Sequence, residues 1–174
     1  MKELLLKTIK TKKLKKNEIF DICKLKNTHW KYGVKSQLNW FKKHIQDNDI
    51  HNMAYIKERL VGYGLLRYRK FLSKKKKSNY LYFDTLIVSK NHRKLKIGHK
   101  LSFLTAKVIK KTKLHSMLIC EKKIELFHKK YKWKKINNKS FQIIDHKYPK
   151  NFSMMCFNQK AKILKDKIEY SIFS

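Results

Sequence analysis

The residues best suited to chemistry lie where an apolar strand ends and an amphipathic helix begins. The segment reads Val88-Ser89-Lys90-Asn91-His92-Arg93-Lys94-Leu95-Lys96-Ile97-Gly98-His99-Lys100-Leu101. Backbone N–H groups at a helix start can hold an anion, and the helix dipole adds partial positive charge there. Basic side chains at that end are unfavourable unless an anion is bound. The pattern indicates a diphosphate site, although one glycine is too few for a Walker or dinucleotide-binding motif.

Two other groups of residues could handle protons or bind a substrate. Asp84 lies in the middle of an otherwise apolar strand, on the same side as Tyr82 and Leu86, where a carboxylate needs a hydrogen-bond partner or a role. Cys120 ends a later strand and is best explained as a small core residue. An earlier polar and aromatic cluster contains His29, Trp30, Gln37 and Trp40. Such side chains suit a sugar or a nucleobase, and they also suit packing in a core or an interface.

Hydrophobic periodicity places these residues in an α+β chain. Strands are predicted over 4–9, 53–57, 60–69, 80–88, 114–120, 141–144 and 152–157. Helices are predicted after caps at Asn17 and Ser36 and over 97–108 and 124–131, with a helix or an ordered tail over 159–173. The first hairpin is expected to turn at Glu58-Arg59, and the lysine-rich segment 73–79 is expected to be a solvated loop. The first half lacks alternating βαβ units, which excludes a doubly wound parallel sheet.

Length and composition limit the possible classes. The 174 residues predict one domain, with a core over about 1–157 and a helix or tail over 158–174. The 45 basic and 12 acidic residues give a net charge of +33, which suggests a polyanionic partner. However, 41 of the basic residues are lysines (45 − 4 arginines), beside abundant Asn, Ile, Phe and Tyr. These are the residues of A/T-rich codons, so codon bias is preferred to a dedicated nucleic-acid surface.

The cysteines and the hydropathy pattern bear on the compartment. Cys23, Cys120 and Cys156 are odd in number and far apart, so they suggest neither a disulfide framework nor a metal site. The leucines at the N-terminus are too few for a signal peptide, and no stretch is long enough to span a membrane. A cytoplasmic protein without a metal is therefore expected.

The strand–turn–helix segment resembles the GNAT superfamily of acyl-CoA-dependent N-acetyltransferases. In that family the fourth strand ends in a hydrophobic residue, and Arg/Gln-x-x-Gly-x-Gly/Ala follows five positions later. Val88 and the segment from Arg93 to Gly98 match in register, with Lys96 in place of the first glycine. A second family pattern, Phe-Tyr-x-Lys-x-Gly-Phe, matches Phe127-His128-Lys129-Lys130-Tyr131-Lys132-Trp133. There His128 replaces the tyrosine and Lys132 the glycine. The resemblance covers roughly residues 1–157.

The resemblance implies a fold, a cosubstrate and roles for particular residues. It implies a mostly antiparallel central sheet, splayed between its fourth and fifth strands and flanked by helices, with acetyl-CoA bound in the splay. Backbone groups of Leu86, Ile87 and Val88 would hold the pantetheine arm. The diphosphate would be held by the turn residues Arg93, Lys94, Leu95, Lys96, Ile97, Gly98, His99 and Lys100. Asp84 is the expected base for the acceptor amine, and His128 the expected acid for the leaving thiolate, since an unperturbed histidine titrates at about 6.5.

The acceptor is expected to bind near the first two helices. The phrases Leu25-Lys26-Asn27 and Gln37-Leu38-Asn39-Trp40-Phe41 are similar to acetyltransferases that modify amino sugars on nucleotide carriers. We therefore expect a small-molecule amine, such as an amino sugar, to contact His29, Trp30, Gln37 and Trp40. A protein or peptide N-acetyltransferase of the same fold is the alternative, and a non-enzymatic RNA- or ribosome-binding protein is a third. A homo-oligomer is possible for each.

Overall fold

The computed structural model describes residues 3–136, 141–157 and 168–173. The chain forms two compact units, one of residues 1–67 and 85–105, the other of residues 68–84 and 106–174. The long strands β3 (Arg59–Ser73) and β4 (Lys76–Val88) and the helix α3 (Ile97–Thr112) contribute residues to both units.

The first unit contains an antiparallel meander. Strand β1 (Leu4–Lys10) pairs with β2 (Ile50–Ile56), and β2 pairs with β3. The turn between β2 and β3 consists of Lys57 and Glu58, both with positive φ. It lies one residue earlier than the predicted Glu58-Arg59 turn. A register shift between Ala54 and Tyr55 interrupts the β2–β3 ladder, which explains why simple alternation misplaced this hairpin.

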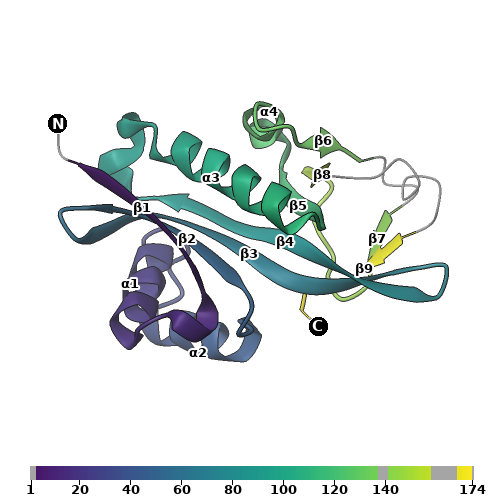
Figure 1. Ribbon diagram of the computed structural model, residues 1–174, viewed down its shortest axis with the longest axis horizontal. Coiled ribbons are helices and arrows are strands. Elements are labelled where there is room, and N and C mark those ends of the chain that lie inside the picture. The colour runs from purple at the N-terminus through teal and green to yellow at the C-terminus, as the bar shows by residue number, and fades with distance from the viewer. Residues whose placement is uncertain (1–2, 137–140, 158–167, 174) are drawn as a thin grey trace. The chain divides into compact units, whose positions relative to one another are not determined.

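Two helices cover one face of the meander (Figure 1). Helix α1 (Lys16–Asn27) follows a short 3₁₀ helix, η1 (Thr11–Lys13), and α2 spans Val34–His44. The predicted caps at Asn17 and Ser36 are wrong, because both helices begin earlier. Glu18 accepts the N–H of Lys15 at 3.0 Å, and Gly33, at φ 86°, precedes α2. The apolar side chains between these helices and the strands include Ile22, Cys23, Phe41, Met53, Tyr63 and Leu65.

Helix α3 approaches β3 closely at one glycine of the first unit. A Cβ atom added to Gly62 would lie 2.7 Å from Cγ2 of Ile97 and 2.9 Å from Cδ1 of Leu101. Both Ile97 and Leu101 are fully buried. The missing side chain of Gly62 therefore lets the first turns of α3 pack directly on the strand, and this contact fixes where the helix begins.

The second unit contains the mixed part of the sheet. Besides the end of α3, it contains a 3₁₀ helix η3 (Lys122–Ile124) and the helix α4 (Glu125–Lys129). Its strands include β5 (His115–Glu121), β6 (Lys134–Lys135), β7 (Phe141–Ile143), β8 (Phe152–Phe157) and β9 (Ile168–Tyr170). Strand β5 is parallel to β4 and antiparallel to β8, which also pairs with β6. Strand β9 pairs with β3 and β7.

Strands β4 and β5 form a parallel pair, with Tyr80 opposite His115 and Phe83 opposite Leu118. Most of the other described pairings are antiparallel. This confirms the expected α+β class, with a mixed and mostly antiparallel sheet flanked by helices.

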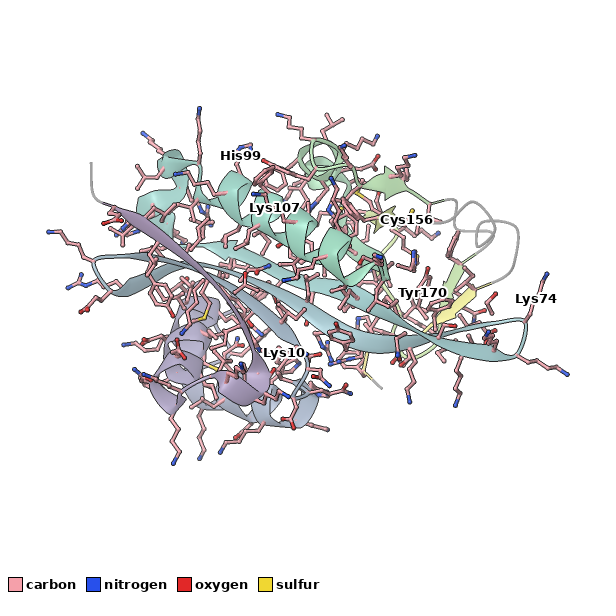
Figure 2. All side chains as sticks on the ribbon, in the orientation of Figure 1. Lys10, Lys74, His99, Lys107, Cys156 and Tyr170 are labelled. Atoms are coloured by element: carbon pink, nitrogen blue, oxygen red, sulfur yellow. The ribbon has the colours of Figure 1, made fainter. Side chains whose placement is uncertain are left out.

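The lysine-rich segment 73–79 is strand and turn, so the predicted loop is wrong. Ser73 ends β3, Lys74 and Lys75 form a two-residue turn with positive φ, and β4 begins at Lys76. Figure 2 shows Lys74 at the tip of this hairpin, directed away from the strands. The charged side chains remain in solvent, so charge did not prevent strand formation. The prediction of a loop over 73–79 rested on its lysine content alone.

The C-terminal segment forms a strand where a helix or a tail was predicted. The predicted element over 159–173 lies partly outside the described residues, which resume with β9. Beyond β9, the Asp145 carboxylate accepts the Ser171 hydroxyl and the N–H groups of Ile172 and Phe173. These bonds fasten the segment in the second unit. No helix in the described part of the chain is long and apolar enough to cross a membrane.

We predict that Gly62→Val destabilises the protein although valine favours strands. The added side chain would overlap Ile97 and Leu101, and overpacking of this kind costs about 1–3 kcal/mol. Urea unfolding measures the loss, with Gly62→Ala expected to give a smaller effect in the same direction. Unchanged or higher stability of Gly62→Val would show that the contact between α3 and β3 is not tight.

Candidate functional site

The expected diphosphate site is a strand–turn–helix segment of the first unit. Strand β4 ends at Val88, a 3₁₀ helix η2 spans Lys90–Leu95, and α3 begins at Ile97. Between the two helices, Lys96 has φ 54° and ψ 24°, a left-handed conformation. A left-handed residue after right-handed ones directs successive N–H groups toward one concavity, which is an anion-binding geometry. The backbone of this segment therefore fits a phosphate group.

The charge of this segment also fits an anion. The side chains of Arg93, Lys94, Lys96 and Lys100 are exposed, and the first turn of α3 contains no acidic residue. From residue 85 to residue 120 the sequence has nine lysines and arginines and no aspartate or glutamate. Positive charge at the positive end of a helix is unfavourable in the absence of a bound anion. Figure 2 shows His99 on the outer side of α3.

Side chains on both faces of β4 pack against neighbouring elements at the end of this strand. The side chains of Leu86 and Val88 pack with Ile97 and Leu101, whereas Ile87 belongs to the core under α1 and α2. The strand is thus fixed by its side chains, which suits the expected role of its backbone groups toward a pantetheine arm. That role remains a prediction.

Asp84, the expected base, lies in the second unit near a pair of tyrosines. Asp84 is half-buried, and the hydroxyl groups of Tyr82 and Tyr148 are 3.1 Å apart. Burial raises the pKa of Tyr82 well above its ordinary value, and the charge of Asp84 raises it further. Asp84 therefore contributes negative charge close to a buried phenol. Tyr148 was not among the predicted site residues, because its loop lacks any periodic pattern.

His128, the expected acid, lies in α4 among aromatic rings. Its ring makes edge-on contacts with Phe83, Phe127 and Trp133, at centroid distances of 6.1, 5.3 and 6.5 Å. Burial lowers its pKa to about 4, so the premise of a titration near neutral pH does not hold. Its Nδ1 atom is buried and has no hydrogen-bond partner within the described residues. His128 is a neutral imidazole with one nitrogen that no group among the described residues satisfies.

The expected acceptor residues come together around α1 and α2. The ring of His29 contacts Trp30 at 4.7 Å, and the buried Gln37 donates a hydrogen bond to the Trp30 carbonyl at 3.1 Å. The Lys26 ammonium lies 3.8 Å from the Trp40 ring centroid, and the Arg67 guanidinium lies 5.4 Å from it. Gln37 and Trp40 therefore already interact within the protein. Whether they also bind a substrate remains a prediction.

Lys26 and Arg67 are buried residues that sequence reasoning missed. A signal was available for each of them. Lys26 follows Ile22 by four positions and so continues the buried face of α1. Arg67 follows Tyr63 and Leu65 with the period of two that marks the buried side of β3. The burial of these two residues was missed because their polar type was given more weight than their place in the apolar pattern.

The described residues give no support to a cysteine nucleophile or to a metal site. The pKa of Cys120 is raised to about 11, chiefly by burial and also by Glu125 and Glu121, which disfavours a thiolate nucleophile. No group of three or more His, Cys, Asp or Glu side chains in the described ranges is arranged to hold a metal ion.

Comparison of the sequence with protein families gives one match. The model of the acetyltransferase (GNAT) family matches residues 17–129, which is more than half of the chain. The matched range includes Asp84, the segment from Val88 to Lys100, and His128. No curated protein matches the sequence significantly.

Solved structures with the same fold are remote in sequence. Escherichia coli ElaA has a TM-score of 0.66 at 12% identity, covering 88% of this chain and 99% of its own. The N-acetyltransferase YhbS from E. coli, in complex with CoA, has a TM-score of 0.68 at 10% identity, covering 96% and 89%. An aminoglycoside acetyltransferase from an uncultured soil sample, in complex with trehalose, has 0.54 at 14%, covering 74% and 85%. At such identities the likeness concerns the fold.

We predict that stability falls as the pH drops from about 6.5 to about 4. Burial lowers the pKa of His51 to about 3, and those of His115 and His128 to about 4. Unfolded histidines titrate near 6.5, so between these values the unfolded chain binds more protons than the folded one. Acid therefore favours unfolding, and the full contribution of these groups is present above about pH 6.5.

Urea unfolding at about pH 7.5 and 5.5 checks this, because histidine is the main side chain that titrates between those values. Calorimetry in buffers of different ionisation enthalpy should show proton uptake on unfolding at the lower pH. Unfolding without proton uptake at about pH 5.5 would contradict the prediction.

Proposed function

The chain belongs to the GNAT family of acetyltransferases, and from this premise we propose that it transfers the acetyl group of acetyl-CoA to the primary amine of a small molecule. The amine of an amino sugar, free or linked to a nucleotide, is the acceptor that we propose. The observation that carries the proposal is the basic strand–turn–helix segment at 88–100, with its left-handed residue, inside the range that matches the family.

The donor is proposed to bind along the end of β4 and the turn after it. Backbone groups of Leu86, Ile87 and Val88 would hold the pantetheine arm. The N–H groups from Lys94 to His99 would hold the diphosphate, with Arg93 and Lys100 contributing charge, since the N–H of Lys100 already donates to the Lys96 carbonyl at 3.2 Å. The CoA complex of YhbS, which shares the fold, supports this choice of ligand.

Acetyl-CoA supplies an activated acetyl group in the form of a thioester. The acceptor must be a free amine when it attacks, and we propose that it binds in its ammonium form and that Asp84 accepts one proton from it. The amine nitrogen then forms a bond to the carbonyl carbon as the carbon–sulfur bond breaks. The nitrogen loses its second proton, and the thiolate gains one, so that an amide and CoA are the products.

His128 is proposed to stabilise the leaving thiolate. Because burial keeps the ring neutral at ordinary pH, its contribution is that of a neutral N–H hydrogen-bond donor and not of an imidazolium acid. The buried Nδ1 atom without a partner in the described residues supports this role, since buried polar atoms are rarely left unsatisfied. The same burial is equally expected for a histidine that only packs, so the test must separate the two.

The proposed acceptor class rests on the polar and aromatic cluster of His29, Trp30, Gln37 and Trp40. Rings beside amide and imidazole groups suit a polyhydroxylated ring. Aminoglycosides are amino sugars, and an aminoglycoside acetyltransferase shares the fold. Peptide amines are the alternative acceptors, because a net charge of +33 would attract acidic peptides.

We predict that acetyl-CoA raises the melting temperature of the protein and that Gly98→Asp abolishes the effect. A ligand at about a hundred times its Kd stabilises the folded state by about 2.7 kcal/mol. The aspartate adds bulk and negative charge beside the proposed diphosphate site. Gly98→Ala, which adds bulk without charge, should keep part of the shift. The absence of any shift with the unmodified protein at saturating acetyl-CoA would refute the proposed cosubstrate.

We predict that Asp84→Asn and His128→Phe slow acetyl transfer with little change in CoA affinity. Loss of a proton acceptor costs about a hundredfold or more in rate, and loss of one hydrogen bond to the thiolate costs about tenfold. A thiol-release assay measures the rates with glucosamine, a UDP-linked amino sugar, kanamycin, spermidine and an acidic peptide as acceptors.

His115→Phe is the matched control, because His115 is another buried histidine of the second unit whose Nδ1 lacks a partner in the described part of the chain. It should lose stability without a specific loss of transfer rate. Equal rates for His128→Phe and the unmodified protein would leave His128 with a packing role. Turnover with the peptide alone would refute the proposed acceptor class and leave the acetyltransferase proposal intact.

A further inference from the structure

The loop between β7 and β8 brings one tyrosine of the second unit against side chains of β4. Within residues 144–151, all of which the structure describes, Tyr148 alone is half-buried and the others are exposed. Tyr148 packs on the apolar cluster that contains Tyr80 and Tyr82, and its hydroxyl lies 3.1 Å from that of Tyr82. The loop therefore places a phenol beside the strand that carries Asp84.

Hydrogen bonds fix this loop at both of its ends. The N–H of Ile144 donates to the Tyr170 carbonyl at 3.0 Å, and the Asn151 carbonyl accepts the N–H of Lys122 at 2.9 Å. The Asp145 carboxylate also accepts N–H groups of the C-terminal segment, as described above. A loop that is anchored in this way can hold Tyr148 firmly enough to serve as a binding group.

Two other aromatic rings lie close to that of Tyr148. The ring centroid of His146 is 4.5 Å away, and that of Phe152 is 5.9 Å away. Aromatic faces attract cations and also pack against sugar rings. The lysines of the loop, Lys147 and Lys150, are exposed, so solvent and salt screen their repulsion of a cation. The surroundings of Tyr148 therefore suit a small molecule that carries an amine.

The two hydroxyls and Asp84 together suit an ammonium group. Burial and, after it, the charge of Asp84 raise the pKa of Tyr82 well above its ordinary value, which indicates that this carboxylate is near the hydroxyl pair. An ammonium group has three N–H donors, and a phenol oxygen can accept one of them while it donates its own proton elsewhere. A carboxylate and a phenol oxygen can therefore share the donors of one ammonium group.

We propose that Tyr148 binds the acceptor through its hydroxyl oxygen, which accepts an N–H of the ammonium group that Asp84 deprotonates. The inference rests on the proposed function, because it concerns the acceptor of that reaction. It assigns a residue that sets the affinity for the amine. The family model matches residues 17–129, so Tyr148 and its loop lie outside the matched range, in a part of the chain that can provide an acceptor preference of its own.

The first test removes one hydroxyl. Tyr148→Phe keeps the ring and should raise the KM for the acceptor about tenfold, as expected for loss of a hydrogen bond to a charged group, with kcat and CoA affinity little changed. The acceptor is whichever of glucosamine, the UDP-linked amino sugar, kanamycin, spermidine and the acidic peptide gives the highest kcat/KM in the thiol-release assay.

Tyr80→Phe is the matched control, because the Tyr80 hydroxyl belongs to the same strand as that of Tyr82 and donates to the Ser171 carbonyl at 2.8 Å. Loss of this buried bond should lower the melting temperature and leave the KM unchanged. Titration calorimetry with CoA confirms that the donor affinity of each variant is intact.

A double variant separates ligand binding from packing. If the Tyr148 hydroxyl only satisfied that of Tyr82, which is 4% exposed, then Tyr82→Phe combined with Tyr148→Phe would restore the KM, because both partners would be apolar. If Tyr148 binds the ammonium group, the double variant keeps a KM at least as high as that of Tyr148→Phe. The N-acetylated product has no charge on that nitrogen, so its inhibition constant should change little in Tyr148→Phe.

The outcomes separate this inference from the proposed function. Turnover with an unchanged KM in Tyr148→Phe would overturn the role of Tyr148 and leave the acetyltransferase proposal intact. Restoration of the KM in the double variant would also overturn it, as would an equal rise of the KM in Tyr80→Phe or of the inhibition constant of the product. The absence of turnover with all five acceptors would instead refute the proposed function on which the inference rests.

Discussion

The close packing of α3 on β3 at Gly62 holds in place the segment of residues 88–100. This segment, which we propose to bind the acyl donor, is called the donor segment. Ile97, which touches this glycine, is the residue directly after Lys96, so the contact fixes the backbone at the end of the turn. Leu86 and Val88 belong to the same apolar cluster and fix the strand before the turn. Strand end and helix start are thus held by buried side chains. The exposed basic side chains of the turn have no part in that packing and remain available for a ligand.

Lysine also occupies most of the backbone positions with positive φ, a conformation that usually favours glycine. Of the seven residues other than glycine that have positive φ in the described ranges, six are lysines and the other is Glu58. Each costs about 1 kcal/mol or more relative to glycine, and hairpin pairing or helix packing must compensate. Lys96 and Lys132, the two lysines at positions where the family pattern has glycine, are both left-handed. At both positions the backbone has a conformation that favours glycine, while the residue present carries an ammonium group.

Periodicity predicted the order of most elements, including the strand, turn and helix over 80–108, because these follow from local patterns of apolar residues. It could not predict what depends on pairing between distant segments. The β2–β3 hairpin was misplaced because of a register shift at Ala54, and β6 has only two residues. The pKa of His128 depends on Phe83 and Trp133, which approach it only in the fold. The type of a residue gives no information about burial of this kind. The sequence could therefore identify His128 as a candidate, but it could not predict that its imidazole is neutral.

The scarce carboxylates explain why the donor segment stays cationic. The chain has 12 acidic residues, and several of them hold structure together. Glu125 pairs with Lys129 and Lys135 and accepts the Ser153 hydroxyl, and Asp145 fastens the C-terminal segment.

Four more acidic residues, Glu3, Glu18, Asp21 and Glu58, line a cavity of about 880 Å³ with Lys7, Lys15 and Lys57. Lys7 forms an ion pair with Glu18 there, whereas the sequence has no aspartate or glutamate between residues 85 and 120. Uniform codon bias would add lysines everywhere, and it does not explain why this stretch has no acid. The proposed binding of an anion would account for it, since a carboxylate beside the turn would compete with a phosphate for the same N–H groups and cations.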